Sequence, residues 1–153
     1  MQHSLQCLLG QSPFSPEQQK AITKAIADAE LQTSGEIRVH IENTLKGDVL
    51  DRAAYLFRQL SMNKTRLRNG VLIYLAVKSR QFAILGDSGI HKAVPESFWD
   101  NIKHRMLLDF RENKFTEGLI AAISAAGEQL KKHFPHLDND KNELPDDISF
   151  GKN

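Results

Sequence analysis

The sequence predicts a single α/β domain, a three-layer α/β/α sandwich with a small mixed central sheet flanked by helices. Apolar residues recur at the period of a helix in several long segments. Between these segments they alternate at period two or run without interruption, as strands do. The chain has 153 residues, enough for one hydrophobic core and too few for two ordinary domains.

The first half of the chain has the pattern of helix, strand and helix. Ser15 with Pro16 and Gln18 has the form of an N-cap with a capping box, and predicts a helix to about Leu31. Apolar and polar residues alternate strictly over 36–42, which predicts a strand with one buried face. Asp48 can cap a second helix. The apolar stripe of that helix is Leu50, Ala53, Ala54, Phe57 and Leu60.

The second half predicts a hairpin followed by two helices. Residues 71–77 are continuously apolar, as expected of a central strand covered on both faces and parallel to the first strand. The loop 78–80 is too short for a crossover to a parallel strand. It therefore predicts a hairpin in which 81–86 runs antiparallel to 71–77. Two further stripes predict the remaining helices: Trp99, Ile102, Met106 and Phe110, then Leu119, Ile123, Ala126, Gly127, Leu130 and Phe134.

Composition limits the partners and the compartment. The predicted domain covers 14–134, between a flexible leader at 1–13 and a polar acidic tail at 135–153. The net charge of +1 gives no field that would attract nucleic acid or an anionic membrane. The single cysteine excludes an internal disulfide framework, and the first residues lack the form of a signal peptide. We therefore expect a cytoplasmic monomer.

Two short motifs match known sites only in their letters. Residues 86–89 read Gly-Asp-Ser-Gly, as around the nucleophile of trypsin-like proteases, but they follow a strand of an α/β pattern, where a glycine-rich turn is the ordinary explanation. Asp138, Asp140 and Asn142 match the start of an EF-hand loop. The later positions hold Glu143 in place of glycine and Ser149 in place of glutamate, which favours a solvated tail.

Three oxygen-bearing side chains are expected at one edge of the sheet. Glu36 begins the first strand, Asn69 precedes the second, and Asp87 follows the third. With the first two strands parallel and the third antiparallel, these positions share one edge. Carboxylate and amide oxygens suit a hard divalent cation, calcium or magnesium. The alternative, of equal weight, is that Glu36 and Asp87 are ordinary solubilising residues at strand ends.

The order of elements and several segments resemble the TPM domain over about residues 14–134. The matching segments are 34–39, 68–73, 82–90 and the stretch 110–119, which holds an aromatic, basic, glycine-leucine signature. The resemblance implies an α/β/α sandwich that binds divalent metal, with acid phosphatase activity reported for plant thylakoid-lumen members. Other members are membrane proteins, and this chain looks like the short soluble bacterial branch.

Two functions remain open from the sequence. The favoured one is a non-catalytic module that binds calcium or magnesium through Glu36, Asn69 and Asp87, or receives a protein partner at that acidic edge. The alternative is a metal-dependent hydrolase of phosphate esters, a weak acid-phosphatase type, in which Arg68 or Arg111 meets the phosphate. No nucleophile is paired with a base by local spacing, and His40 and His91 are candidate bases only if folding brings them to the site.

Overall fold

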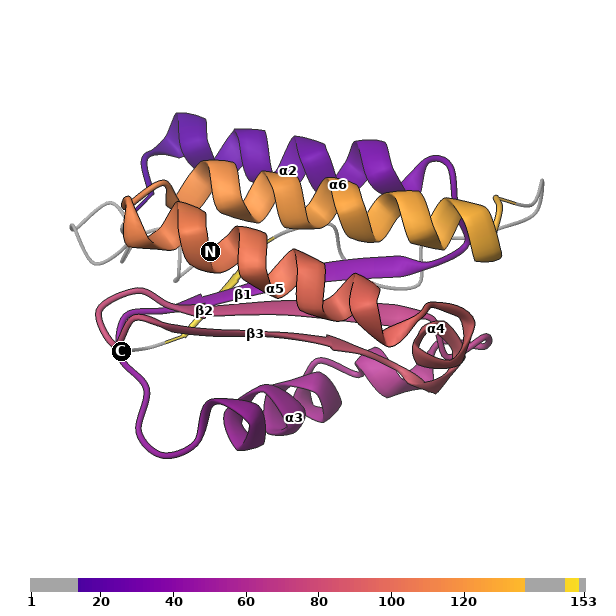
Figure 1. The fold of residues 1–153 in the computed structure, drawn as a ribbon, viewed down its shortest axis with the longest axis horizontal. Coiled ribbons are helices and arrows are strands. Elements are labelled where there is room, and N and C mark those ends of the chain that lie inside the picture. Colours follow the sequence, from indigo (N-terminus) through magenta and orange to yellow (C-terminus); the bar gives the residue numbers. More distant parts are fainter. Residues whose placement is uncertain (1–13, 137–147, 152–153) are drawn as a thin grey trace.

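The computed structural model describes residues 14–136 and 148–151. The predicted leader at 1–13 and the residues Asp138, Asp140, Asn142 and Glu143 of the EF-hand-like stretch lie outside the described residues. The described part is an α/β sandwich with helices on both faces of one sheet (Figure 1). This confirms the predicted fold class.

The sheet has four strands in the order β3-β2-β1-β4. The first strand, β1 (Glu36–Glu42), runs parallel to β2 (Gly70–Ala76), and β3 (Gln81–Gly86) returns antiparallel to β2. Every residue of β2 is buried, as its unbroken apolar sequence predicts. The fourth strand, β4 (Ser149–Phe150), pairs in parallel with β1 and was not predicted.

Three long helices cover one face of the sheet (Figure 1). They are α2 (Pro16–Glu30), α5 (Glu96–Arg111) and α6 (Phe115–His133). The Ser15 hydroxyl accepts from the Gln18 N–H, and the Gln18 side chain accepts from the Ser15 N–H, so the capping box is confirmed. The predicted stripe of α5 is buried throughout. It packs in the main core with alternate residues of the strands, Ile37, Val39, Ile41, Val71, Ile73 and Leu75.

The other face of the sheet packs on α3 (Val49–Gln59), which Asp48 caps as predicted. Its buried residues are Ala53, Leu56 and Phe57, whereas Leu50 is 54% exposed. The predicted stripe is therefore rotated, because Leu56 faces Leu72, Tyr74 and Ala83 in this smaller core. The expectation of one buried face for β1 is wrong, because His40 and Glu42 on its other face are also buried, where they contact Arg52, Tyr74 and Ser149.

Two short helices lie in segments for which the sequence predicted no helix. The 3-10 helix η2 (Met62–Lys64) inserts Met62 fully into the smaller core. The helix α4 (Ser88–Ala93) begins directly after β3 and buries Ile90. Both elements stand beside the strand ends that carry the candidate site, and they determine what surrounds it.

Candidate functional site

Backbone hydrogen bonds bring the three predicted oxygen-bearing residues to one end of the sheet. Glu36 pairs in register with Gly70, and its N–H donates to the Asn69 carbonyl at 3.4 Å. The Asp87 N–H donates to the Gly70 carbonyl at 2.9 Å. The starts of β1 and β2 and the end of β3 therefore lie side by side at one end of the sheet, as the strand directions require.

These three side chains are buried rather than solvated. Glu36 is 2% exposed, Asn69 1% and Asp87 7%. The alternative that Glu36 and Asp87 are solubilising strand-end residues is therefore wrong, because such residues extend into water. A buried carboxylate has a large cost of desolvation unless cations or hydrogen-bond donors compensate it.

Arg68 compensates Asp87. Its Nε and terminal nitrogen donate to the two carboxylate oxygens at 2.7 and 2.9 Å, a bidentate geometry. This hydrogen-bonded carboxylate raises the pKa of the Arg68 guanidinium. Asp87 also caps α4 by accepting from the Ser88 N–H at 2.7 Å. The Arg68 side chain is 52% exposed whereas that of Asp87 is 7% exposed, so Arg68 lies between the Asp87 carboxylate and solvent.

An open pocket of about 340 Å3 leads to Asp87 from the α3 side of the sheet. Its wall includes Arg58 of α3, Asn63 of η2, Arg68 and Asp87. The Asn63 Oδ1 atom is buried and accepts no hydrogen bond from the described residues. Sequence reasoning missed Asn63, because nothing in the polar stretch 63–69 distinguishes it from its neighbours.

The donor set fits a hard divalent cation in chemistry. The side-chain N–H of Asn69 donates to the Ser34 hydroxyl at 3.4 Å, while its Oδ1 is buried and accepts no hydrogen bond within the described part. Such an oxygen is available to a cation. The described residues contain no group of three or more His, Cys, Asp or Glu side chains suited to a metal. A cation here would rely on two carboxylates, amide oxygens and water, as weaker sites do.

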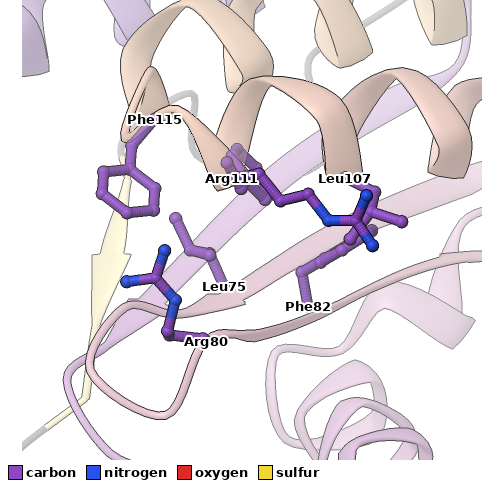
Figure 2. Close-up of a pocket in the computed structure, with 7 residues that line it drawn as sticks. Leu75, Arg80, Phe82, Leu107, Arg111 and Phe115 are labelled. Atoms are coloured by element: carbon purple, nitrogen blue, oxygen red, sulfur yellow. The ribbon is translucent and has the colours of Figure 1, made fainter.

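The structure does not bring Arg111 to this site. Arg111 ends α5 and, with Arg80 of the β2–β3 hairpin, lines a pocket at the opposite end of β2 from Asn69 (Figure 2). His40 lies on β1 near that far end as well. His91 of α4 is one helical turn from Ser88, yet its ring stacks on Trp99 with centroids 6.2 Å apart. Trp99 is 5% exposed, as expected of a core residue.

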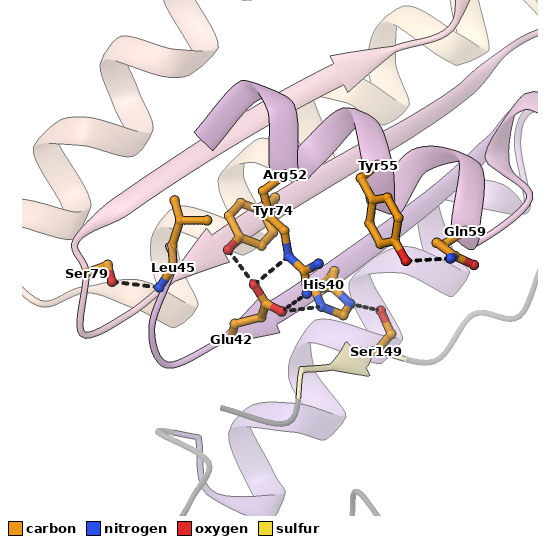
Figure 3. A network of polar contacts seen from close by, with 9 residues as sticks. All are labelled: His40, Glu42, Leu45, Arg52, Tyr55, Gln59, Tyr74, Ser79 and Ser149. Atoms are coloured by element: carbon orange, nitrogen blue, oxygen red, sulfur yellow. Dashed lines mark hydrogen bonds and ion pairs between the residues drawn. The ribbon is translucent and has the colours of Figure 1, made fainter. Parts of the chain in front are cut away.

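A second buried polar cluster surrounds Glu42 at the end of β1 (Figure 3). Its carboxylate accepts from Arg52 of α3 and from the Tyr74 hydroxyl at 2.5 Å, and lies 3.5 Å from His40 Nε2. Burial alone would raise the pKa of Glu42, but the contacts with His40, Arg52 and Tyr74 lower it to about 2. Through this cluster, Arg52 of α3 contacts a polar residue of β1, the strand in which polar and apolar residues alternate.

The Glu42 cluster also contacts β4. His40 Nδ1 lies 2.7 Å from the Ser149 hydroxyl, and the Gly151 N–H donates to the Ile41 carbonyl at 2.8 Å. A side chain at Gly151 would overlap the Glu42 carboxylate. This contact could not be predicted from the sequence, because a two-residue strand within a polar segment is too short to show the alternation of a strand.

Among the described residues, a mixed sheet with three long helices on one face, α3 on the other and a polar strand-end site defines a class of small α/β domains. The family model of the TPM domain matches residues 11–129. The chain belongs to the TPM domain family. None of the curated proteins matches it.

Solved structures of similar proteins share the fold. The NMR structure of the BA42 protein from the psychrophilic bacterium Bizionia argentinensis is 47% identical, with a TM-score of 0.85 over 92% of this chain and 97% of that one. An N-terminal domain from P. gingivalis is 22% identical, with a TM-score of 0.66 over 81% of this chain and 82% of that one. The latter shows the fold alone. No helix among the described residues is long and apolar enough to cross a membrane.

Proposed function

We propose that this TPM domain binds a divalent cation, calcium or magnesium, at the sheet end formed by Glu36, Asn69 and Asp87. The observation that carries the proposal is the buried Asn69 Oδ1, which accepts no hydrogen bond from the described residues although two carboxylates stand on the neighbouring strands. Oxygen ligands of this kind are those that both cations prefer.

Arg68 determines how a cation would bind to Asp87. A guanidinium already neutralises Asp87, so a cation that reaches Asp87 exchanges with Arg68 rather than adding to a bare carboxylate. The exposed half of the Arg68 side chain can move into solvent at small cost. The affinity should therefore be modest, with a dissociation constant of roughly 10⁻⁴ to 10⁻³ M.

Hydrolysis of phosphate esters is the second candidate, and one feature of the pocket favours it. Arg58 and Arg68 both line the pocket that contains Asp87. A cation held by Asp87 with two guanidinium groups nearby could orient a phosphate ester and stabilise charge on it. In this proposal Arg68 releases Asp87 to the cation and turns to the phosphate.

The test is a titration of the full chain with calcium and with magnesium, followed by amide chemical shifts and by calorimetry. The expected result is saturable shifts at residues 34–37, 68–70 and 86–89. The double variant Glu36→Gln, Asp87→Asn should reduce the affinity at least tenfold, since both ligand charges are lost. Asn at position 87 retains an oxygen for the α4 cap, so the fold should persist.

The matched control is Asp28→Asn, which removes an exposed carboxylate from α2 and should leave binding unchanged. Unchanged binding in the double variant would overturn the proposed site. For the second candidate, phosphatase activity should fall in the double variant and in the presence of chelator. Activity that survives both would contradict a metal-dependent reaction.

A further inference from the structure

A second pocket lies at the opposite end of the sheet and belongs to neither proposed function. It forms where the β2–β3 hairpin meets the end of α5 and the start of α6 (Figure 2). Its volume is about 50 Å3. Apolar side chains line its interior, and two arginines border it: Leu75, Arg80, Phe82, Leu107, Phe110, Arg111 and Phe115.

The signature stretch 110–119 builds much of this pocket. Phe110 and Arg111 end α5, and Phe115 begins α6. Phe110 packs edge-on against Phe82 with centroids 5.2 Å apart and lies 5.6 Å from the Phe115 ring. A side chain at Gly118 would overlap Phe110, so this glycine lets the two helices close around the aromatic cluster. The pocket is thus formed by rigid elements.

Two guanidinium groups at this pocket have no carboxylate partner among the described residues. Neither Arg80 nor Arg111 makes an ion pair there. The nearby carboxylates have other partners, because Asp109 pairs with Arg105 at 3.2 Å and Glu112 with Lys114 at 3.3 Å. Figure 2 shows Arg80 and Arg111 on two sides of the apolar interior.

Turn and helix geometry fix the backbone positions of both arginines. Arg80 has a φ of 54° in the hairpin turn, and its N–H donates to the Val77 carbonyl at 3.2 Å. Arg111 is the last residue of a sixteen-residue helix. The start of α6 adds partial positive charge, since Lys114 gives it no side-chain cap, although exposed Glu117 in the first turn offsets part of this charge.

We propose that this pocket binds a small organic anion, with its charged group between Arg80 and Arg111 and a short apolar group inserted among the aromatic side chains. The charged group is a carboxylate or a phosphate monoester, since guanidinium groups bind both through paired hydrogen bonds. Each water-sized group occupies roughly 10 to 15 Å3 of such a cavity. The pocket volume of about 50 Å3 therefore accommodates an apolar group of about three to five non-hydrogen atoms.

The test uses the full chain and the probes 3-methylbutanoate and 3-methylbutyl phosphate, followed by amide shifts at Arg80, Leu107, Arg111 and Phe115. We expect saturable binding in the millimolar range, as suits a ligand with few atoms. Acetate lacks the apolar group, and 3-methylbutanol lacks the charge. Both should bind at least fivefold more weakly than the better of the two anions, and the tighter anion identifies the charged group.

Substitutions of single arginines distinguish binding in this pocket from nonspecific attraction to surface charge. Arg80→Gln and Arg111→Gln should each weaken binding at least fivefold, whereas Arg105→Gln, on the same helix but paired with Asp109, should leave it unchanged. Equal binding of acetate, equal binding of 3-methylbutanol, or insensitivity to both pocket substitutions would each overturn the proposal. Binding here should also be indifferent to calcium and to Asp87→Asn, so its outcome is independent of the cation site.

Discussion

The Arg68 guanidinium forms two hydrogen bonds with the Asp87 carboxylate across nineteen residues of sequence, and both residues flank the start of β2. This pair joins the loop before β2 to the start of α4. It also places a side-chain cation where the proposed metal ion would bind. Arg68 and a divalent cation are therefore competitors for one carboxylate.

The first prediction is that Arg68→Gln tightens divalent-cation binding. Removing the competing guanidinium frees Asp87, and because the Arg68 side chain is largely exposed to solvent, which weakens the pair, the gain in affinity should be a few-fold. Calorimetry with calcium and magnesium measures the change. Arg58→Gln is the control, since Arg58 lines the same pocket without bonding to Asp87. Weaker binding in Arg68→Gln would show that Arg68 assists the cation rather than competing with it.

The second prediction concerns the letters Gly-Asp-Ser-Gly at 86–89. A side chain at Gly89 would overlap the carbonyl oxygens of Leu67 and Arg68, and backbone atoms cannot rotate away. The Gly89 N–H also donates to the Arg68 carbonyl at 2.8 Å. Gly89→Ala should therefore destabilise the fold by about 1 to 3 kcal/mol.

Ser88→Ala is the comparison for that prediction. Ser88 is exposed, and the cap of α4 uses its backbone N–H rather than its hydroxyl. The free energy of unfolding, from denaturant titration, should change by less than about 0.5 kcal/mol. In this assignment Gly89 is required for close packing and the Ser88 hydroxyl is not. A large loss of unfolding free energy in Ser88→Ala, together with an unchanged value in Gly89→Ala, would contradict it.

The regular elements were predictable because their signals are local. The capping box at Ser15, the alternation of 36–42 and the unbroken apolar run of β2 each depend on neighbours in sequence. The strand directions then placed Glu36, Asn69 and Asp87 at one end of the sheet without any coordinates. Their burial was not predictable, since it depends on elements that the sequence shows only as polar or glycine-rich loops.

Contacts between distant residues account for what the sequence missed. Nothing local distinguishes Arg68, which bonds to Asp87, from Arg111, which lies at the other end of the sheet. The partners of Glu42 come from β1, α3 and β2, so its burial was hidden by the alternating pattern of β1. Polar residues on a predicted strand were assigned to solvent, whereas here they connect the sheet to α3.

The third prediction is that amides of β2 exchange most slowly. This strand is hydrogen-bonded to β1 and β3 and buried on both faces, so exchange at Ile73 requires global opening. Native-state hydrogen exchange should give Ile73 an opening free energy equal to that of global unfolding. Amides of Glu17 and Gln18, in the first turn of α2, should exchange much faster because that turn can fray. Comparable rates for the two regions would contradict the central position of β2.

The fourth prediction is a loss of stability in acid that depends on Glu42. Its pKa is about 2 in the folded protein and 4.5 when the residue is fully solvated. A carboxyl group whose folded pKa is lowered stabilises the fold above its unfolded pKa. That contribution declines as the pH falls from about 5 towards 2, and the difference in pKa corresponds to about 3 kcal/mol.

Glu42→Gln isolates this contribution. The variant should be less stable than the natural chain at pH 7, because Arg52 loses its charged partner, and the difference in unfolding free energy between the two should shrink as the pH falls. Chemical denaturation at a series of pH values between 7 and 2.5 measures both quantities. Glu128→Gln removes an exposed carboxylate from α6 and should leave the pH profile unchanged. A constant difference between Glu42→Gln and the natural chain across this range would show that the Glu42 carboxylate does not supply the acid sensitivity.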